Sequence, residues 1–263
     1  MLKQRVQTAL VVGPLLIAAI LLLPSFWLGV LLLAAVGAAA WELSRLGGYD
    51  MPAWLRGAFT GLTLILAAGV LWTGPDILFL WLGVTAWFAA IIWLINPEAA
   101  IPGWVRLALG VVILITGWAA VVILHQQEYG NWLVLMLFAL VVAADVGAYF
   151  AGRQFGRKKL APRISPGKTW AGVGGGLLCA LPVALVGAGL LPVTGFLGFV
   201  VIGLVTVLFS VVGDLVESLL KRHAGVKDSG ELLPGHGGVL DRADSLLAAA
   251  PVFLILVAGA GAL

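Results

Sequence analysis

Residues 195–222 read GFLGFVVIGLVTVLFSVVGDLVESLLKR, and the first charge in this run is Asp214. An α-helix needs roughly 20 mostly apolar residues to cross a bilayer, and the part before Asp214 nearly supplies them. The run is apolar on every side, so no face of the helix is suited to water. This predicts a membrane-spanning helix that carries its charges only near one end.

The composition extends this prediction to the whole chain. Of the 263 residues 62% are hydrophobic and 10% are charged, whereas a soluble domain has about 25% charged residues. That composition excludes both a water-soluble globular protein and a disordered chain. A single cysteine, Cys179, excludes an internal disulfide and a cysteine-based zinc cluster.

We expect an all-α, polytopic integral membrane protein with about nine transmembrane helices. The N-terminal region, 1–131, would contain about five spans, and the C-terminal region, 132–263, about four. Only Pro24-Ser25 separates the first two spans, so a single bent or re-entrant unit is an alternative. Lys3 and Arg5 precede an apolar run as in a signal peptide, but no small-residue cleavage site follows, so we expect a retained span. The predicted spans are about 7–23, 25–41, 57–73, 77–95, 105–125, 132–152, 170–190, 195–220 and 245–262.

The distribution of Lys and Arg predicts the orientation. With nine spans and a cytoplasmic N-terminus, the segments on the cytoplasmic side contain all 15 Lys and Arg residues, and the outer segments contain none. Short cytoplasmic loops carry such an excess of positive charge. The chain lacks a transit peptide, so we expect a prokaryotic inner membrane. The two largest cytoplasmic loops would be 153–169 and 221–244.

Charged residues concentrate in the C-terminal region, where the segment from Asp145 to Asp244 holds 17 of the 27. Asp145 precedes Arg153 by eight residues, and Asp214 precedes Lys221 by seven. At about 1.5 Å per residue, these carboxylates lie about 12 and 10 Å below the cytoplasmic helix ends. A charge at that depth is costly and is usually functional.

The helix end after Asp214 is organised around its axis. Asp214, Glu217, Ser218, Lys221 and Arg222 fall within an arc of about 140° at 100° per residue. An amphipathic helix end emerging into water would account for the two cations. It does not account for the depth of Asp214.

The segment that follows combines glycines with acids. Pro234, Gly235, Gly237 and Gly238 predict turns that let the backbone approach a ligand closely. Asp241, Asp244 and Ser245 then lie at positions i, i+3 and i+4 as the last helix starts, where acids also serve as ordinary N-terminal caps.

The cationic loop 153–169 includes Ser165, Lys168 and Thr169, which are donors suited to phosphate. Gly167-Lys168-Thr169 is not a P-loop, because Pro162 stands where that motif requires glycine. Gly172 and Gly176 in the next span indicate a close helix-packing face.

Acids within the membrane, with oxygen ligands only, suit a hard cation such as Mg²⁺. Cations beside them suit phosphate groups, and together they suit phosphoryl or nucleotidyl transfer. A site at this depth meets both a lipid phosphate and a soluble nucleotide. The residues therefore predict a metal-dependent enzyme acting on a lipid headgroup.

Two runs and a few flanking residues resemble a known family. Residues 218–244 read Ser-x-x-Lys-Arg-x4-Lys-Asp-x5-Pro-Gly-His-Gly-Gly-x-x-Asp-Arg-x-Asp, and residues 165–169 read Ser-Pro-Gly-Lys-Thr. With Asp145 and Gly213-Asp214, they resemble the phosphatidate cytidylyltransferases, also called CDP-diacylglycerol synthases. The N-terminal half is similar only in character. One departure is Ala171, where the family usually has Glu.

The resemblance implies that CTP and phosphatidic acid react to give CDP-diacylglycerol and pyrophosphate for phospholipid biosynthesis, with the active site on the cytoplasmic side. The cofactor would be Mg²⁺, with a second cation, Mg²⁺ or K⁺, as an option. Membrane lipids would be further partners, nucleic acid would not, and a homodimer stays open. The implied catalytic residues are Asp214, Asp241, Lys227 and Asp228. The implied metal ligands are Asp214, Asp241, Asp244, Asp145 and Glu217. The implied substrate-binding residues are Ser165, Lys168, Thr169, Ser218, Lys221, Arg222, His236, Gly237 and Arg242.

Two other classes compete with this interpretation. An ion-coupled transporter also places Asp and Lys within its spans, but such proteins often have paired halves, and residues 1–140 offer no counterpart to the acidic cluster. A related lipid nucleotidyltransferase, such as a CDP-archaeol synthase, is the second alternative. A CDP-alcohol phosphotransferase is not favoured, because its spaced acidic motif is absent.

Overall fold

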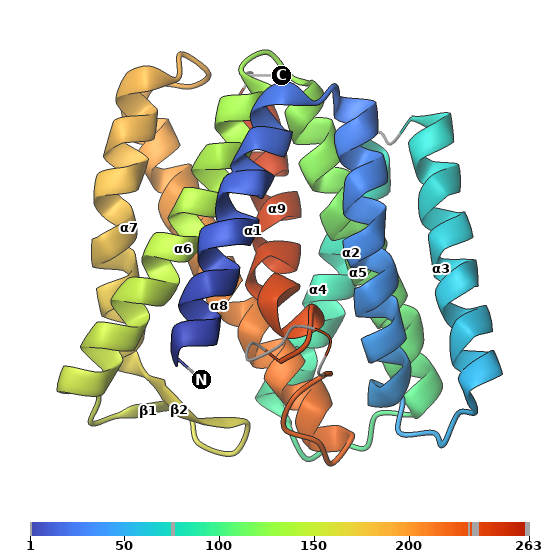
Figure 1. Ribbon diagram of the computed structural model, residues 1–263. Helices are drawn as coiled ribbons and strands as arrows, with labels where there is room; N and C mark the ends of the chain where they lie inside the picture. Colours follow the sequence, from blue (N-terminus) through green and yellow to red (C-terminus); the bar gives the residue numbers. More distant parts are fainter. Residues whose placement is uncertain (1, 75–76, 231, 233–236, 261–263) are drawn as a thin grey trace.

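The computed structural model describes residues 2–74, 77–230, 232 and 237–260, with the main chain alone for 2–10 and 77–78. Within these residues the chain forms nine helices and one short hairpin (Figure 1). The elements are α1 (Leu2–Leu22), α2 (Ser25–Leu46), α3 (Ala53–Thr73), α4 (Ile77–Ile95), α5 (Gly103–Gln126), α6 (Gly130–Phe155), β1 (Lys159–Ala161), β2 (Ser165–Thr169), α7 (Trp170–Leu190), α8 (Phe196–His223) and α9 (Leu240–Gly259).

The all-α membrane architecture is confirmed, and each predicted span coincides with one helix. Seven helices are long and apolar enough to cross a membrane. Within the part of α1 and α4 whose side chains the structure describes, the apolar stretches are shorter, Val11–Leu22 and Phe79–Ile95. The number of crossings and the side of the N-terminus therefore stay predictions. Figure 1 shows α1 and α2 as two helices that run in opposite directions, and whether the pair crosses the membrane or is re-entrant stays a prediction.

The interior and the surface of the bundle are both apolar. Of the seven long apolar helices, α5 is the most deeply buried and packs against α2, α4 and α9, while α3 is the most exposed. Phe199 of α8 and Phe253 of α9 meet edge to face, with ring centroids 6.1 Å apart. Large side chains such as Trp72, Ile95 and Leu197 are exposed. Apolar residues on the outside as well as the inside are what a lipid environment requires.

Small residues bring α6 and α7 into close contact, as the Gly172 and Gly176 pattern predicts. A Cβ atom on Gly176 would lie 2.9 Å from the carbonyl oxygen of Ala144. A Cβ atom on Gly175 would overlap the Cβ of Ala151. Close backbone approach of this kind drives helix association in membranes, where the hydrophobic effect between helices is absent.

Two neighbouring glycines of α7 provide a matched test of this packing. Gly175→Ala should destabilise the protein by about 1–3 kcal/mol, because the added methyl has no space against α6. Gly174→Ala should be neutral or stabilising, because nothing lies within 4 Å of a Cβ there and alanine favours a helix. Thermal unfolding in detergent would compare the two variants. Equal midpoints would contradict the close α6–α7 contact.

The hairpin β1–β2 was not predicted. Its strands pair antiparallel, with Lys159 opposite Thr169 and Ala161 opposite Ser165. The sequence indicates a charged loop here. Between the two strands, Ile164 is the one large side chain that is buried. Tertiary contacts hold it: Arg222 of α8 donates from Nε to the carbonyl oxygen of Ile164 at 3.2 Å. The hairpin therefore lies against the end of α8.

Candidate active site

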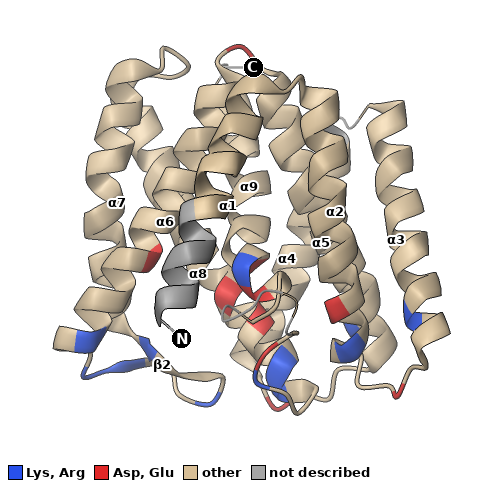
Figure 2. Ribbon diagram, viewed as in Figure 1, with Lys and Arg blue, Asp and Glu red and all other residues tan. Residues whose placement is uncertain are grey.

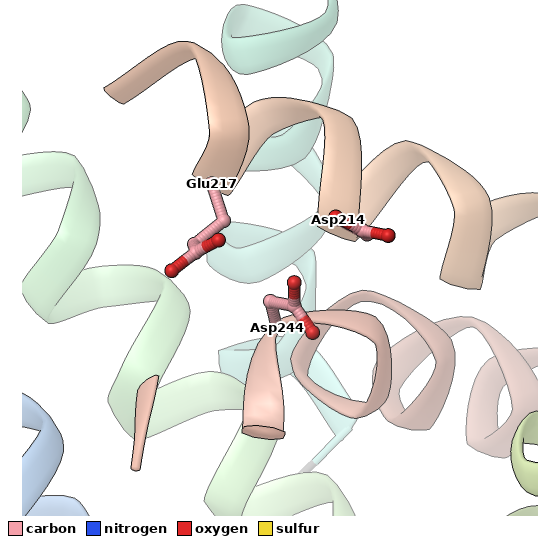
Figure 3. Close-up of side chains that lie close together, drawn as sticks. All are labelled: Asp214, Glu217 and Asp244. Atoms are coloured by element: carbon pink, nitrogen blue, oxygen red, sulfur yellow. The ribbon is translucent and has the colours of Figure 1, made fainter. Parts of the chain in front are cut away.

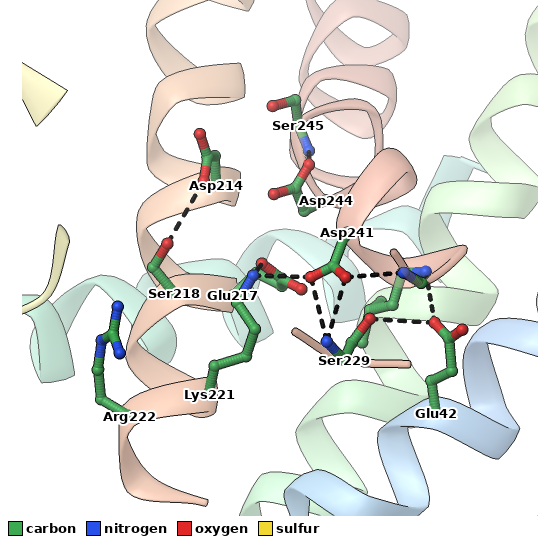
Figure 4. A network of polar contacts seen from close by, with 12 residues as sticks. Glu42, Asp214, Glu217, Ser218, Lys221, Arg222, Ser229, Asp241, Asp244 and Ser245 are labelled. Atoms are coloured by element: carbon green, nitrogen blue, oxygen red, sulfur yellow. Dashed lines mark hydrogen bonds and ion pairs between the residues drawn. The ribbon is translucent and has the colours of Figure 1, made fainter. Parts of the chain in front are cut away.

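The last three turns of α8 carry the polar face that the sequence predicts. Asp214, Glu217, Ser218 and Lys221 recur every three or four residues, which places them on one side of the helix. Ser218 donates its hydroxyl to Oδ1 of Asp214 at 3.4 Å. Figure 4 shows Glu217 and Lys221 reaching toward Asp241 at the start of α9.

Three carboxylates meet between α8 and α9. One oxygen each from Asp214, Glu217 and Asp244 lies within 4.8 Å of the others (Figure 3). Gly213 allows this approach, because a Cβ atom there would overlap the carbonyl oxygen of Asp244. Glu217 and Asp244 are buried. Clustered buried acids are costly unless a cation compensates them, and carboxylate oxygens are what Mg²⁺ prefers. The donor set therefore fits a hard divalent cation.

The hairpin delivers a cation to this acidic cluster of Asp214, Glu217 and Asp244. Lys168 of β2 lies with Nζ 2.6 Å from Oδ2 of Asp214. The next residue, Thr169, is buried, and its side chain accepts a hydrogen bond from the backbone N–H of Gly172. Thr169 thus caps α7 and fixes the end of β2, as the preferred threonine at an N-cap does.

Lys221 joins the acidic cluster to Asp241. Its Nζ lies 2.5 Å from Oε2 of Glu217 and 2.7 Å from Oδ1 of Asp241. The carboxylate of Asp241 also accepts from the backbone N–H of Ser229 and from that of Gly238, at 3.1 and 2.9 Å. Asp241 therefore organises the loop around it, and its oxygens already have donors (Figure 4).

A cavity of about 490 Å³ opens beside these residues. Asp145 of α6 lines it together with Asp214, so two acids that are far apart in sequence share one chamber. Figure 2 shows Lys, Arg and most acids gathered in the half of the bundle that holds the hairpin. The charged residues that line the cavity are Asp145, Lys168, Asp214, Lys221, Asp228, Asp241, Arg242 and Asp244.

Other predicted site residues lie at varying distances from this chamber. Among the described residues, six predicted site residues do not line it: Ser165, Glu217, Ser218, Arg222, Lys227 and Gly237. Arg222 instead supports the hairpin. Gly237 has a φ of 83° and allows the turn before α9. Pro234, Gly235 and His236 lie outside the described residues. Ala171 lies in the first turn of α7.

Sequence reasoning missed Glu42. The predicted second span ends at residue 41, whereas α2 continues to Leu46 and buries the Glu42 side chain within the fold. Its carboxylate contacts the loop before α9, about 200 residues later. An acid directly after an apolar run was the available signal, but it also suits an ordinary helix end.

Comparison with known proteins identifies the family. The profile of the cytidylyltransferase family matches residues 3–259. This chain belongs to the cytidylyltransferase family. The match includes the acidic cluster, the hairpin and α2, so it covers nearly the whole bundle.

Three curated relatives align with most of the length of this cytidylyltransferase. The phosphatidate cytidylyltransferase of Pseudomonas aeruginosa is 43% identical, and the alignment spans 99% of this chain and 98% of the relative. The phosphatidate cytidylyltransferase of Haemophilus influenzae is 38% identical, over 96% of this chain and 97% of the relative. The phosphatidate cytidylyltransferase of Brucella suis is 41% identical, over 81% of this chain and 73% of the relative.

Proposed function

We propose that this cytidylyltransferase transfers the cytidylyl group of CTP to phosphatidic acid, giving CDP-diacylglycerol and pyrophosphate. Relatives that bear the name phosphatidate cytidylyltransferase match nearly the entire chain. The observation that carries the proposal is the cavity beside the acidic cluster, because it combines carboxylates for a cation with cations for phosphate. This combination suits nucleotidyl transfer.

Asp214, Glu217 and Asp244 would hold Mg²⁺, since their oxygens converge. When bound, Mg²⁺ would neutralise phosphate charge and orient the α-phosphate of CTP. Asp145 and Asp241 line the same cavity, and Asp145 would serve a second cation, Mg²⁺ or K⁺. Asp241 contributes by orienting Lys221, with which it pairs.

Lys168, Lys221 and Arg242 line the cavity and would bind phosphate oxygens. An oxygen of the phosphatidate phosphate attacks the α-phosphorus of CTP and forms the new P–O bond. The bond from that phosphorus to the bridging oxygen of the β-phosphate breaks, and pyrophosphate leaves with the electron pair. A phosphomonoester has a second pKa of about 6, so its oxygen is already nucleophilic. No strong general base is required.

The hairpin end of the bundle would face the cytoplasm. Lys and Arg gather in that half (Figure 2), and cytoplasmic loops of membrane proteins carry excess positive charge. CTP would enter from that side and phosphatidic acid from the bilayer. The bacterial relatives favour a prokaryotic inner membrane. A transporter or a CDP-archaeol synthase is not favoured, because these relatives bear another name.

Metal removal tests the proposal directly. The protein in detergent, incubated with phosphatidic acid, labelled CTP and Mg²⁺, should place label in the lipid phase. EDTA should abolish the labelling, and excess Mg²⁺ should restore it, because the carboxylates of the acidic cluster repel phosphate without a cation. Phosphatidylglycerol is the matched control acceptor, since its phosphodiester lacks the monoester oxygens. If a folded sample labels no lipid, the proposed activity is rejected. If labelling persists in EDTA, the metal dependence is rejected.

A further inference from the structure

Glu42 is the most deeply buried acid of the N-terminal helices that the structure describes, with 1% of its surface exposed. Its carboxylate accepts three hydrogen bonds, all from the segment 229–240. Oε1 accepts from the backbone N–H of Val239 at 3.1 Å. Oε2 accepts from the backbone N–H of Leu240 at 2.9 Å and from the hydroxyl of Ser229 at 3.1 Å. A side chain of α2 therefore ties Ser229, within the α8–α9 connection, to the start of α9 (Figure 4).

These contacts supply a cap that α9 lacks locally. Its N-cap residue is Val239, which has no side-chain oxygen and makes no side-chain cap. The first N–H groups of a helix have no partner within the helix, and negative charge is favourable there. Glu42 provides both the acceptor and the charge from another helix. The start of α9 is thereby fixed relative to α2.

The loop is shaped around this carboxylate. A Cβ atom on Gly230 or Gly238 would overlap oxygens of Glu42 or the hydroxyl of Ser229. Both glycines therefore let the backbone wrap around Glu42 more closely than other residues could. Space as well as hydrogen bonding is matched to Glu42.

Ser229 links Glu42 to the candidate active site. Its hydroxyl donates to Glu42, while its backbone N–H donates to Asp241 at 3.1 Å. Gly238, next to Val239, donates its N–H to the same carboxylate of Asp241. One turn further along α9, Asp244 reaches the acidic cluster. The hydrogen-bond partners of Glu42 therefore either contact Asp241 themselves or lie within a few residues of Asp241 and Asp244 in the chain.

We propose that Glu42 is a positioning residue, which fixes Ser229 and the start of α9 so that Asp241 and Asp244 hold their geometry. Its effect on turnover rests on the proposed cytidylyl transfer; its effect on the loop does not. The N-terminal helices thereby contribute to the active site through a hydrogen-bond network and not only through packing.

Glu42→Gln is the sharpest test, because it keeps the shape and replaces one acceptor oxygen with an N–H₂ donor. Either Val239 N–H, or Leu240 N–H together with the Ser229 hydroxyl, then faces a donor. Glu128→Gln is the matched control, since Glu128 is exposed in the α5–α6 connection, at the opposite end of the bundle. Both variants would be prepared as the full chain in detergent.

The first measurement is amide hydrogen exchange of metal-free protein. We expect roughly tenfold faster exchange in the peptide that contains Val239 and Leu240 in Glu42→Gln, and wild-type exchange in Glu128→Gln. The second measurement is the Mg²⁺ concentration that gives half-maximal turnover. It should rise roughly 10- to 100-fold in Glu42→Gln, as is typical when a residue that orients metal ligands is lost.

Wild-type exchange at Val239 and Leu240 in Glu42→Gln would overturn the proposal. A lower maximal rate with an unchanged Mg²⁺ midpoint would also overturn it, because general destabilisation alone reduces the amount of active protein. If wild-type protein transfers no cytidylyl group, the proposed function fails, while the exchange comparison still decides the role of Glu42 in the loop.

Ser229→Ala keeps the proposal testable should Glu42→Gln fail to fold. It removes one of the three donors to Glu42 and leaves the backbone N–H that Asp241 accepts. We expect the same two shifts with smaller size, about threefold, since one neutral hydrogen bond is lost. Wild-type exchange together with a wild-type Mg²⁺ midpoint would overturn the link from Glu42 to Asp241.

Discussion

Asp214→Asn should abolish cytidylyl transfer while leaving the protein inserted and folded. Asp214 lies where α8 faces the cavity, contributes to the acidic cluster and pairs with Lys168. Asparagine is nearly isosteric but lacks the charge that a divalent cation requires. Residues that only orient metal ligands cost roughly 10- to 100-fold in activity when changed, so a direct ligand should cost at least about 100-fold.

The measurement is transfer of labelled CTP to phosphatidic acid by purified variants at saturating Mg²⁺. Asp50→Asn is the matched control, because it makes the same chemical change at an exposed residue between α2 and α3. It should retain wild-type turnover. Size-exclusion profiles and thermal unfolding would establish that both variants are folded. Normal turnover by Asp214→Asn would sink the assignment of the acidic cluster as the metal site.

Asp241→Asn should lower turnover strongly, and unlike Asp214→Asn it should loosen the loop before α9. Its side chain is only 10% exposed and accepts from Lys221, Ser229 and Gly238. In asparagine one of the two oxygens becomes an N–H₂ donor, which would face at least one of these three donors and could not bond to it. Removing one partner of a buried ion pair lowers the free energy of unfolding by roughly 3–5 kcal/mol. The reason here is that Lys221 keeps its charge. We expect roughly a 10- to 100-fold loss of turnover, the range for a residue that orients others.

Two measurements separate this variant from Asp214→Asn. Turnover is measured as above, and hydrogen exchange is measured in the peptides that contain Ser229 and Gly238. Faster exchange should occur in Asp241→Asn and not in Asp214→Asn, whose oxygens accept from no backbone N–H among the described contacts. If Asp241→Asn exchanges and turns over like wild type, Asp241 has neither role. Asp50→Asn again serves as the control.

Most of the fold follows from local sequence properties. Each predicted span matches a helix, and 77–95 and 170–190 match at both ends. Apolar length determines these elements, because a backbone in lipid must satisfy its hydrogen bonds internally and so forms helices. The helix ends are less well predicted: α2 extends five residues beyond its predicted end and α9 begins five residues before its predicted start. Polar residues are compatible with either a helix end or a loop.

Part of the candidate site was also predictable. The spacing of Asp214 and Glu217, and of Asp241 and Asp244, places each pair on one helix face whatever the surroundings. Asp145 and Asp214, for which the sequence predicts similar depths, line one cavity. Which acids converge could not be predicted: Asp214, Glu217 and Asp244 gather, whereas Asp241 is engaged by Lys221 and backbone N–H groups.

The sequence by itself determined a helical membrane bundle, the concentration of charge in its C-terminal half, and the resemblance to a family. These depend on composition, period and motif, which are local. Only the tertiary structure decided that a hairpin brings Lys168 to Asp214, and that Glu42 caps a helix about 200 residues away. Such contacts depend on how separate helices pack, because a buried polar group must find its partner wherever the fold places one.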